Sequence, residues 1–200
     1  VAPAAPTGLI VSDVTGDQGT ALNLSWAVNP EGDLKDYRLR RSTGTGLTAG
    51  TAVLATLVGT THQDSGLTAG TTFYYRLTAR DASLNESGIS ATDVGLAPVD
   101  NLAPGAPTGV VVADVPSDQG VALQLSWTPN GASDLKDYEI RRSTVFSGSG
   151  NAPVLVRIAA PGTTHQDAGL AAGTTYYYSV FARDVSLNVS GAGEVSAYTV

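Results

Sequence analysis

Short alternating runs of apolar and polar residues cover most of the chain, and they predict strands rather than helices. Residues 21–27 read ALNLSWA, which places Leu22, Leu24 and Trp26 on one face and Asn23 and Ser25 on the other. Glycine, proline, aspartate and serine bound each run, and no window of helical length carries a helical apolar period. The pattern predicts an all-β protein.

Seven runs of this kind in the first half of the chain predict the strands of one β-sandwich. In the third run, Tyr37 and Leu39 face inward while Arg38 and Arg40 face outward. In the sixth run, Phe73, Tyr75, Leu77 and Ala79 face inward, and Tyr74, Arg76 and Thr78 face outward. The predicted strands span residues 8–14, 21–27, 36–42, 52–58, 60–66, 71–80 and 87–95.

The whole pattern occurs twice. GDQGTALNLSW at 16–26 recurs as SDQGVALQLSW at 117–127, and DLKDYRLRRST at 33–43 recurs as DLKDYEIRRST at 134–144. The second copy then carries a two-residue insertion between Thr144 and Gly162. Each copy has the usual length of a domain. We therefore expect a first domain over 1–98, a proline-containing linker over 99–105 and a second domain over 106–200, joined in an elongated molecule.

Three features of each copy resemble fibronectin type III domains. They are a tryptophan in the second strand, a Tyr-x-aliphatic pattern in the third, and the phrase Leu-x-x-Gly-Thr-x-aromatic before the sixth. The resemblance covers nearly the whole chain and implies two tandem seven-stranded immunoglobulin-like β-sandwiches. The structural residues are Trp26, Tyr37, Leu67 and Phe73 in the first copy, and Trp127, Tyr138, Leu170 and Tyr176 in the second.

The wording of the repeats looks like bacterial members of this family, which stand between other domains of secreted or surface proteins. The family also places a tyrosine at the corner before the sixth strand, with its hydroxyl bonded to backbone a few residues upstream. By spacing, that residue is Tyr176 in the second copy, and Phe73 replaces it in the first.

Composition excludes several classes of function. The net charge is −7, so no basic surface is expected to bind nucleic acid or anionic membranes. No apolar run is long enough for membrane insertion. The chain has no cysteine, which excludes disulfides, thiolate zinc sites and a cysteine nucleophile. It also has no methionine at position 1, so we expect a processed product or a piece of a longer protein.

Each copy contains one histidine, His62 or His165, at the head of a His-Gln-Asp phrase. A zinc site needs three or four converging ligands, and one histidine per copy does not supply them. No serine lies in a Gly-x-Ser-x-Gly elbow that would suggest a nucleophile. We interpret both histidines as partly buried strand residues, and we predict no catalytic residue, no metal site and no cofactor.

Polar residues in the loops have structural interpretations too. Asp13 and Asp17 are expected to form turns. Asp81 with Asn85, and Asp184 with Asn188, suggest calcium ligands, but they fit the fixing of a turn better. Whether calcium binds there is left open, as is modification of the Asn-x-Ser sequons at Asn23, Asn85 and Asn188.

Aromatic residues on the outer surface are the remaining binding candidates. Tyr177 and Phe181 are expected to face outward on the sixth strand of the second copy, as Tyr74 does in the first. Val145 and Phe146 lie in the longer loop after its third strand. An exposed loop phenylalanine marks either a contact site or a side chain folded back on its own domain.

The sequence favours a non-catalytic structural spacer and protein-interaction module of a larger secreted or surface protein. Its partners would be neighbouring domains of a longer chain or other protein subunits. One alternative is a segment of a self-assembling extracellular filament, sheath or surface layer. The other is an accessory carbohydrate-binding module, in which the outward aromatics would contact polysaccharide.

Overall fold

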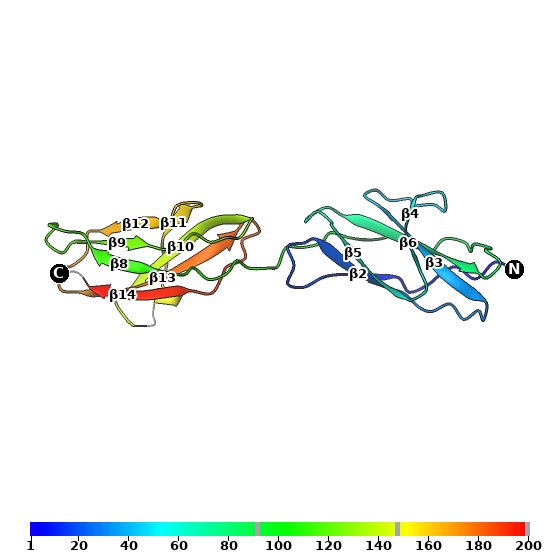
Figure 1. Ribbon diagram of the computed structural model, residues 1–200, viewed down its shortest axis with the longest axis horizontal. Coiled ribbons are helices and arrows are strands. Elements are labelled where there is room, and N and C mark those ends of the chain that lie inside the picture. Colours follow the sequence, from blue (N-terminus) through cyan, green and yellow to red (C-terminus); the bar gives the residue numbers. More distant parts are fainter. Residues whose placement is uncertain (91–92, 147–148, 199–200) are drawn as a thin grey trace. The chain divides into compact units, whose positions relative to one another are not determined.

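The computed structural model describes residues 1–90, 93–146 and 149–198. The chain divides into two compact units, Val1–Leu102 and Ala103–Val200, which we call the first and second domains. Each is built of antiparallel strands in two sheets (Figure 1), and one short 3-10 helix, η1 (Ser149–Asn151), lies in the second domain. The all-β prediction is confirmed. In the described parts of the chain, no helix is long and apolar enough to cross a membrane.

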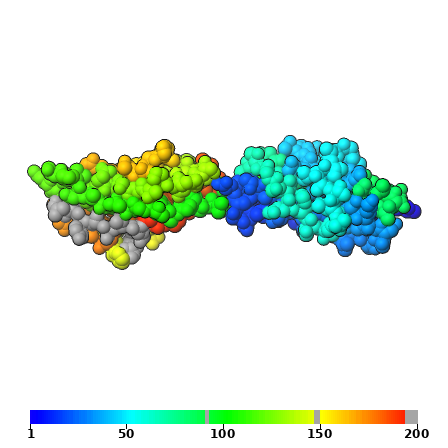
Figure 2. Space-filling model, in the orientation of Figure 1, coloured from blue at the N-terminus to red at the C-terminus, as the bar shows by residue number. Residues whose placement is uncertain are grey.

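The first domain packs a three-stranded sheet of order β1-β2-β5 against a four-stranded sheet of order β4-β3-β6-β7. The segment around β4 forms much of the visible surface of this domain, drawn in cyan (Figure 2). The strands are β1 (Ile10–Asp13), β2 (Ala21–Ser25), β3 (Leu34–Ser42), β4 (Val53–Leu57), β5 (Thr61–Ser65), β6 (Phe73–Asp81) and β7 (Val94–Leu96).

The second domain repeats this topology, with sheets of order β12-β9-β8 and β11-β10-β13-β14. Its strands are β8 (Val111–Asp114), β9 (Ala122–Ser126), β10 (Leu135–Ser143), β11 (Val154–Ala159), β12 (Thr164–Ala168), β13 (Thr175–Asp184) and β14 (Gly193–Tyr198).

The predicted seventh strand of the first domain is wrong in its first part. Residues 87–90 run beside β6 without forming a strand, and predicted positions 91–92 lie outside the described residues. The reason is that serine hydroxyls replace backbone carbonyls as acceptors. The Ala79 amide donates to Ser87 Oγ at 2.8 Å, and the Leu77 amide donates to Ser90 Oγ at 3.1 Å. A regular backbone ladder therefore begins only at β7.

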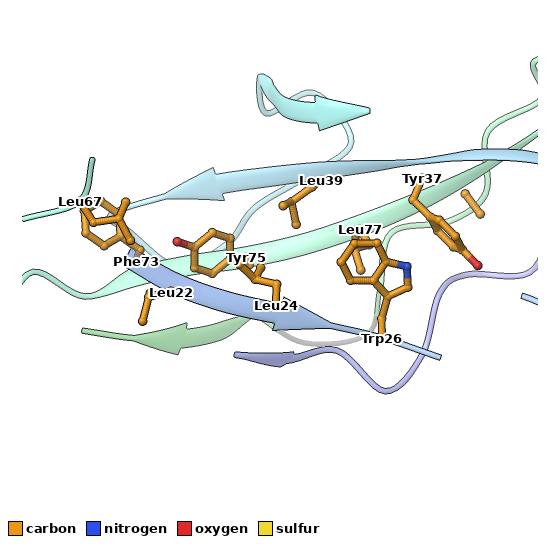
Figure 3. Packing of buried hydrophobic residues seen from close by; sticks show 10 residues of the cluster. Leu22, Leu24, Trp26, Tyr37, Leu39, Leu67, Phe73, Tyr75 and Leu77 are labelled. Carbon is orange, nitrogen blue, oxygen red and sulfur yellow. The ribbon is translucent and has the colours of Figure 1, made fainter. Parts of the chain in front are cut away.

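The predicted inward residues form one core per domain. In the first domain, the inward side chains of β2, β3 and β6 meet between the sheets (Figure 3). Trp26 packs edge-to-face on Tyr37, with ring centroids 5.5 Å apart, and Trp127 does the same on Tyr138 at 5.2 Å. Large aromatic groups dominate core energetics, so these pairs anchor each sandwich.

Part of the expected linker is held by the first domain. The Val99 amide donates to Asp13 Oδ1 and the Asn101 side-chain amide donates to Asp13 Oδ2, both at 3.0 Å. Asp17 forms the expected turn by accepting from the Gly19 and Thr20 amides. The Asn101 amide also donates to the Asp17 carbonyl. The aspartates at the β1–β2 turn thus fix the chain where it leaves this domain.

A buried carboxylate joins the two sheets of each domain. On β5, His62 lies opposite Leu24 and Asp64 opposite Leu22, so alternation points Asp64 into the interior. Asp64 is 4% exposed and accepts hydrogen bonds from Arg41 of β3 at 2.8 and 2.9 Å and from the Tyr75 hydroxyl of β6 at 2.6 Å. Burial, together with this bond, raises the pKa of Tyr75.

The second domain contains the same arrangement. Asp167 of β12 accepts from Arg142 at 2.9 and 2.8 Å and from the Tyr178 hydroxyl at 2.7 Å. Burial lowers the pKa of the neighbouring His165, and the negative charge of Asp167 opposes that shift. The aspartate, rather than the histidine, is therefore the residue of the repeated His-Gln-Asp phrase that carries the tertiary interaction.

The corner before the sixth strand differs between the copies. In the second domain the Ala171 amide donates to the Tyr176 hydroxyl oxygen at 3.1 Å, which is the bond expected at this corner. In the first domain Phe73 has no hydroxyl, and only its ring packing remains, at 8% exposure. Arginines lie over both rings, with Arg142 and Arg41 each 5.3 Å from the ring centroid.

Tyr176→Phe should lower the free energy of unfolding of the second domain by about 0.5–1.5 kcal/mol, the usual net contribution of one hydrogen bond. Urea denaturation of the whole chain, followed by tryptophan fluorescence, measures this loss. Phe73→Tyr is the matched control, and it should leave the first domain unchanged or more stable. Clear destabilisation by Phe73→Tyr would show that the corner assignment is wrong.

Asp64→Asn should lower the free energy of unfolding of the first domain by about 2–3 kcal/mol, because the buried Tyr75 hydroxyl and Arg41 lose a charged acceptor. The same denaturation experiment measures it, with the second domain as an internal reference. His62→Ala, two residues away on β5, should cost less. An equal or larger loss in His62→Ala would contradict the role given to the aspartate.

Candidate functional site

The binding candidates of the second domain differ in exposure and in the contacts that they make. Val145 and Phe146 are exposed in the loop after β10, at 66% and 74%. Phe146 contacts Tyr177 of β13, with ring centroids 5.5 Å apart and planes at 73°. Phe146 thus folds back on its own domain while most of its surface stays in solvent. An edge-to-face pair does not present two coplanar faces on which a sugar ring could stack.

The prediction that Phe181 is an outward contact residue needs correction. It points away from the core, as alternation on β13 requires, but it is only 9% exposed. The Arg141 guanidinium covers its ring, 4.6 Å from the centroid. Phe181 is therefore a packing partner of an arginine and is not available for a ligand.

Phe181 belongs to a larger difference between the outer faces of the two four-stranded sheets. In the first domain the predicted outward residue Arg40 is 1% exposed, buried beneath its own partners. It donates to the Thr51 carbonyl at 3.1 Å, to Thr78 Oγ1 at 2.8 Å and to Glu86 Oε1 at 2.7 Å. Glu86 also pairs with Arg38 at 3.0 Å.

In the second domain the carboxylate that serves the equivalent arginine comes from strand β10, whereas Glu86 of the first domain lies in the segment after β6. Glu139 of β10 occupies the position of Arg38 and is 3% exposed. It accepts from Arg141 at 2.8 Å and from Arg157 of β11 at 2.8 Å. Val189 stands where the first domain has Glu86, and Phe181 stands where it has Thr78.

These changes compensate one another. A buried arginine needs a charged partner, because an unpaired buried charge costs several kcal/mol. Glu86 serves Arg40 and Glu139 serves Arg141, and the pKa of each of these two carboxyl groups is shifted in the same direction. Burial would raise the pKa of Glu86 and of Glu139, but hydrogen bonds from Thr78 and Arg40 in one, and from Arg141 and Arg157 in the other, hold it below the ordinary value.

Sequence reasoning missed this network because it treats outward charged residues as solvated. The available signal was the coordinated exchange between the copies, Arg38 for Glu139 together with Glu86 for Val189. What the face does chemically is hold opposite charges in fixed pairs. The carboxylates of Asp64, Glu86, Glu139 and Asp167 all accept from arginine, so these groups are already engaged in structural bonds.

The Asp-Asn loops are fixed by their own side chains, as a turn-forming role requires. Asp81 accepts the Asn85 backbone amide at 2.8 Å and its side-chain amide at 2.7 Å, and Asp184 accepts from Asn188 at 2.8 and 2.9 Å. The Asn85 side-chain bond lowers the pKa of Asp81. The sequon asparagines Asn85 and Asn188 therefore use their amide nitrogens within the fold.

A shallow depression lies on the outer face of the β1-β2-β5 sheet and contains Asn23, the remaining sequon asparagine. It has a volume of about 540 Å³ and is lined by Ser12, Asn23, Leu24, Ser25, Thr61, His62 and Gln63. In the second domain Gln124 replaces Asn23, and its longer side chain donates to the Leu125 and His165 carbonyls. Small polar residues predicted to face outward were the one sequence feature that pointed to this depression.

Glu139→Gln should lower the free energy of unfolding of the second domain at neutral pH by about 2–4 kcal/mol, because two arginines lose their shared charge. The pKa of Glu139 is lower in the folded state than the ordinary 4.5, so the carboxylate stabilises the fold above that pH. This stabilisation is lost as the pH falls through the folded-state pKa.

Denaturation of the parent and Glu139→Gln chains at several pH values tests both parts. The difference between the chains should be full near neutrality and should shrink in acid. Val189→Ala, on the same face but outside the charge network, is the control and should show no such pH dependence. A difference that stays constant into acid would contradict the assignment.

Two bacterial enzymes contain segments that are similar to this chain. No protein-family model matches the chain. Exoglucanase B of Cellulomonas fimi is 30% identical over 201 residues, which are 99% of this chain and 17% of that enzyme. Chitinase A1 of Niallia circulans is 30% identical over 154 residues, 75% of this chain and 20% of that enzyme. The chain thus spans a fifth or less of the length of these relatives.

Among solved structures, a segment of two fibronectin type III domains from chicken tenascin matches with a TM-score of 0.51 and 22% identity, covering 97% of this chain and 99% of that one. The similarity is one of fold, and it agrees with the two sandwiches, their strand orders and the corner tyrosine. The chain therefore has the fold of two tandem fibronectin type III domains.

Proposed function

We propose that the chain is a non-catalytic structural module of a larger extracellular protein, in which it holds neighbouring functional parts apart. The observation that carries the proposal is the alignment, in which 99% of this chain corresponds to only 17% of Exoglucanase B. A match of that extent is expected for an accessory segment of a multidomain protein. The relatives are named as polysaccharide-degrading enzymes, which supports an extracellular location for this chain as well.

The structure supports a mechanical role through the way the first domain holds its chain ends. At the entrance, the Asn29 side-chain amide donates to the Ala4 carbonyl at 2.7 Å, and the Tyr37 hydroxyl accepts from the Asn29 backbone amide at 2.7 Å. At the exit, Asp13 holds Val99. Both ends of the domain are therefore hydrogen-bonded to the domain itself, which supports a module that keeps its neighbours apart.

The buried carboxylates already accept hydrogen bonds from arginines, which supports the non-catalytic part of the proposal. A general acid or base must reach a substrate proton. Asp64 and Asp167 lie between the sheets, 4% and 5% exposed, and Glu139 is 3% exposed beneath two arginines. None of these three carboxylates is placed to meet a polymer chain in solvent.

The module should be a monomer without hydrolytic activity. Sedimentation equilibrium over a wide concentration range should give the mass of one 20.3 kDa chain. Incubation with cellulose and with chitin should release no reducing sugar. Reversible growth of the mass with concentration would overturn the spacer and favour the filament alternative, and reproducible sugar release by the purified chain would overturn the non-catalytic assignment.

Binding to insoluble polysaccharide can be measured with the same purified chain. The chain should remain in the supernatant when it is mixed with insoluble cellulose or chitin. Retention by either polymer that disappears in Tyr177→Ala would favour the carbohydrate-binding alternative. Val121→Ala, an exposed apolar position of the second domain that lies before β9, serves as the matched control.

A further inference from the structure

The second domain clamps its incoming chain with an asparagine that is followed by glycine. The Asn130 side-chain amide donates to the Gly105 carbonyl at 2.7 Å, and its Oδ1 accepts from the Ala132 amide at 2.9 Å. The Asn130 backbone amide donates to the Tyr138 hydroxyl oxygen at 2.6 Å. This clamp matches the one that Asn29, Ala4 and Tyr37 form in the first domain.

The two clamps differ in the next residue. Asn29 precedes Pro30, whereas Asn130 precedes Gly131 in the only Asn-Gly pair of the chain. Gly131 is exposed, and a side chain at that position would meet no atom within 4 Å. The space beside its Cα is therefore open, and glycine gives the backbone nitrogen the freedom to approach the asparagine side chain. Proline has no backbone N–H, so the same approach is chemically blocked in the first domain.

We infer that Asn130 is a site of spontaneous deamidation that releases the entry clamp of the second domain. The Gly131 nitrogen loses its proton to base and attacks Cγ of Asn130, and ammonia leaves as the cyclic imide forms. Water then opens the imide at either carbonyl and gives aspartate or isoaspartate. The net change is asparagine plus water to an acid plus ammonia, so no enzyme or cofactor is required.

The product cannot remake the clamp. A carboxylate at position 130 has no N–H to donate to the Gly105 carbonyl, and its charge faces that carbonyl oxygen instead. Isoaspartate also adds a methylene to the backbone, which displaces the amide that is bonded to Tyr138. Because both amide atoms are hydrogen-bonded in the folded domain, the reaction proceeds from conformers in which the clamp is open. It is slower than in an unstructured peptide and faster at alkaline pH.

The test is ageing of the whole chain at mildly alkaline pH and physiological temperature, with peptide mapping by mass spectrometry. A synthetic peptide spanning Trp127–Asp134 reports the unrestrained rate. The expected result is a progressive mass increase of an amide-to-acid conversion at residue 130, with an isoaspartate peak, while Asn29 stays unmodified. Gly131→Pro, which copies the first domain, should abolish the conversion. Gly131→Ala should slow it, and this variant serves as the test if the proline variant fails to fold.

The structural consequence has a separate readout. The aged chain and the variant Asn130→Asp should both show a lower unfolding temperature for the second domain and an unchanged first domain. An Asn130 that stays intact after the peptide has reacted completely would overturn the inference. Equal deamidation in Gly131→Ala and the parent, or an aged chain with unaltered stability, would overturn it too.

Discussion

Each domain depends on one buried carboxylate that bridges its two sheets. Asp64 lies on the three-stranded sheet, and its partners Arg41 and Tyr75 lie on the other. A buried charge is tolerated only when it is paired and hydrogen-bonded, so the sheets must meet in the register that brings these three groups together. A slip of β5 by one residue would replace Asp64 by a neighbour that cannot pair with Arg41. The aspartate of the repeated His-Gln-Asp phrase follows from this requirement.

The sequence was sufficient for those features that depend on local periodicity. Inward positions on β2, β3 and β6 follow the alternation, as Leu22, Tyr37 and Leu77 show at 0% exposure. The features it missed depend on partners that are distant along the chain. Arg40 appears as a solvated outward residue until Glu86, 46 residues later, is placed beside it. Residues 87–90 do not form the predicted strand for the same reason. The hydroxyls of Ser87 and Ser90 accept hydrogen bonds from β6 in place of the backbone carbonyls that periodicity alone would predict.

The candidate surface was harder to predict than the fold, for a related reason. Phe181 and Tyr177 alternate correctly, but only tertiary contacts decide that Arg141 covers the ring of Phe181 and that Phe146 packs against Tyr177. An outward direction on a strand gives the face of a side chain. It does not give exposure, because a long arginine can cover its neighbours with its apolar stem.

The two copies separate what the fold requires from what it leaves free. Interior residues contact both sheets at once, so the carboxylate, arginine and tyrosine between the sheets are the same in both domains. On the outer face the pair Asp36–Arg80 recurs as Asp137–Arg183. The carboxylate for the neighbouring arginine is less constrained, because Glu86 comes from the segment after β6 whereas Glu139 comes from β10. That face can therefore change its polarity without loss of the fold. Any difference in what the two domains contact is accordingly expected on the outer face of the four-stranded sheet, where Arg38 and Thr78 of one domain become Glu139 and Phe181 of the other.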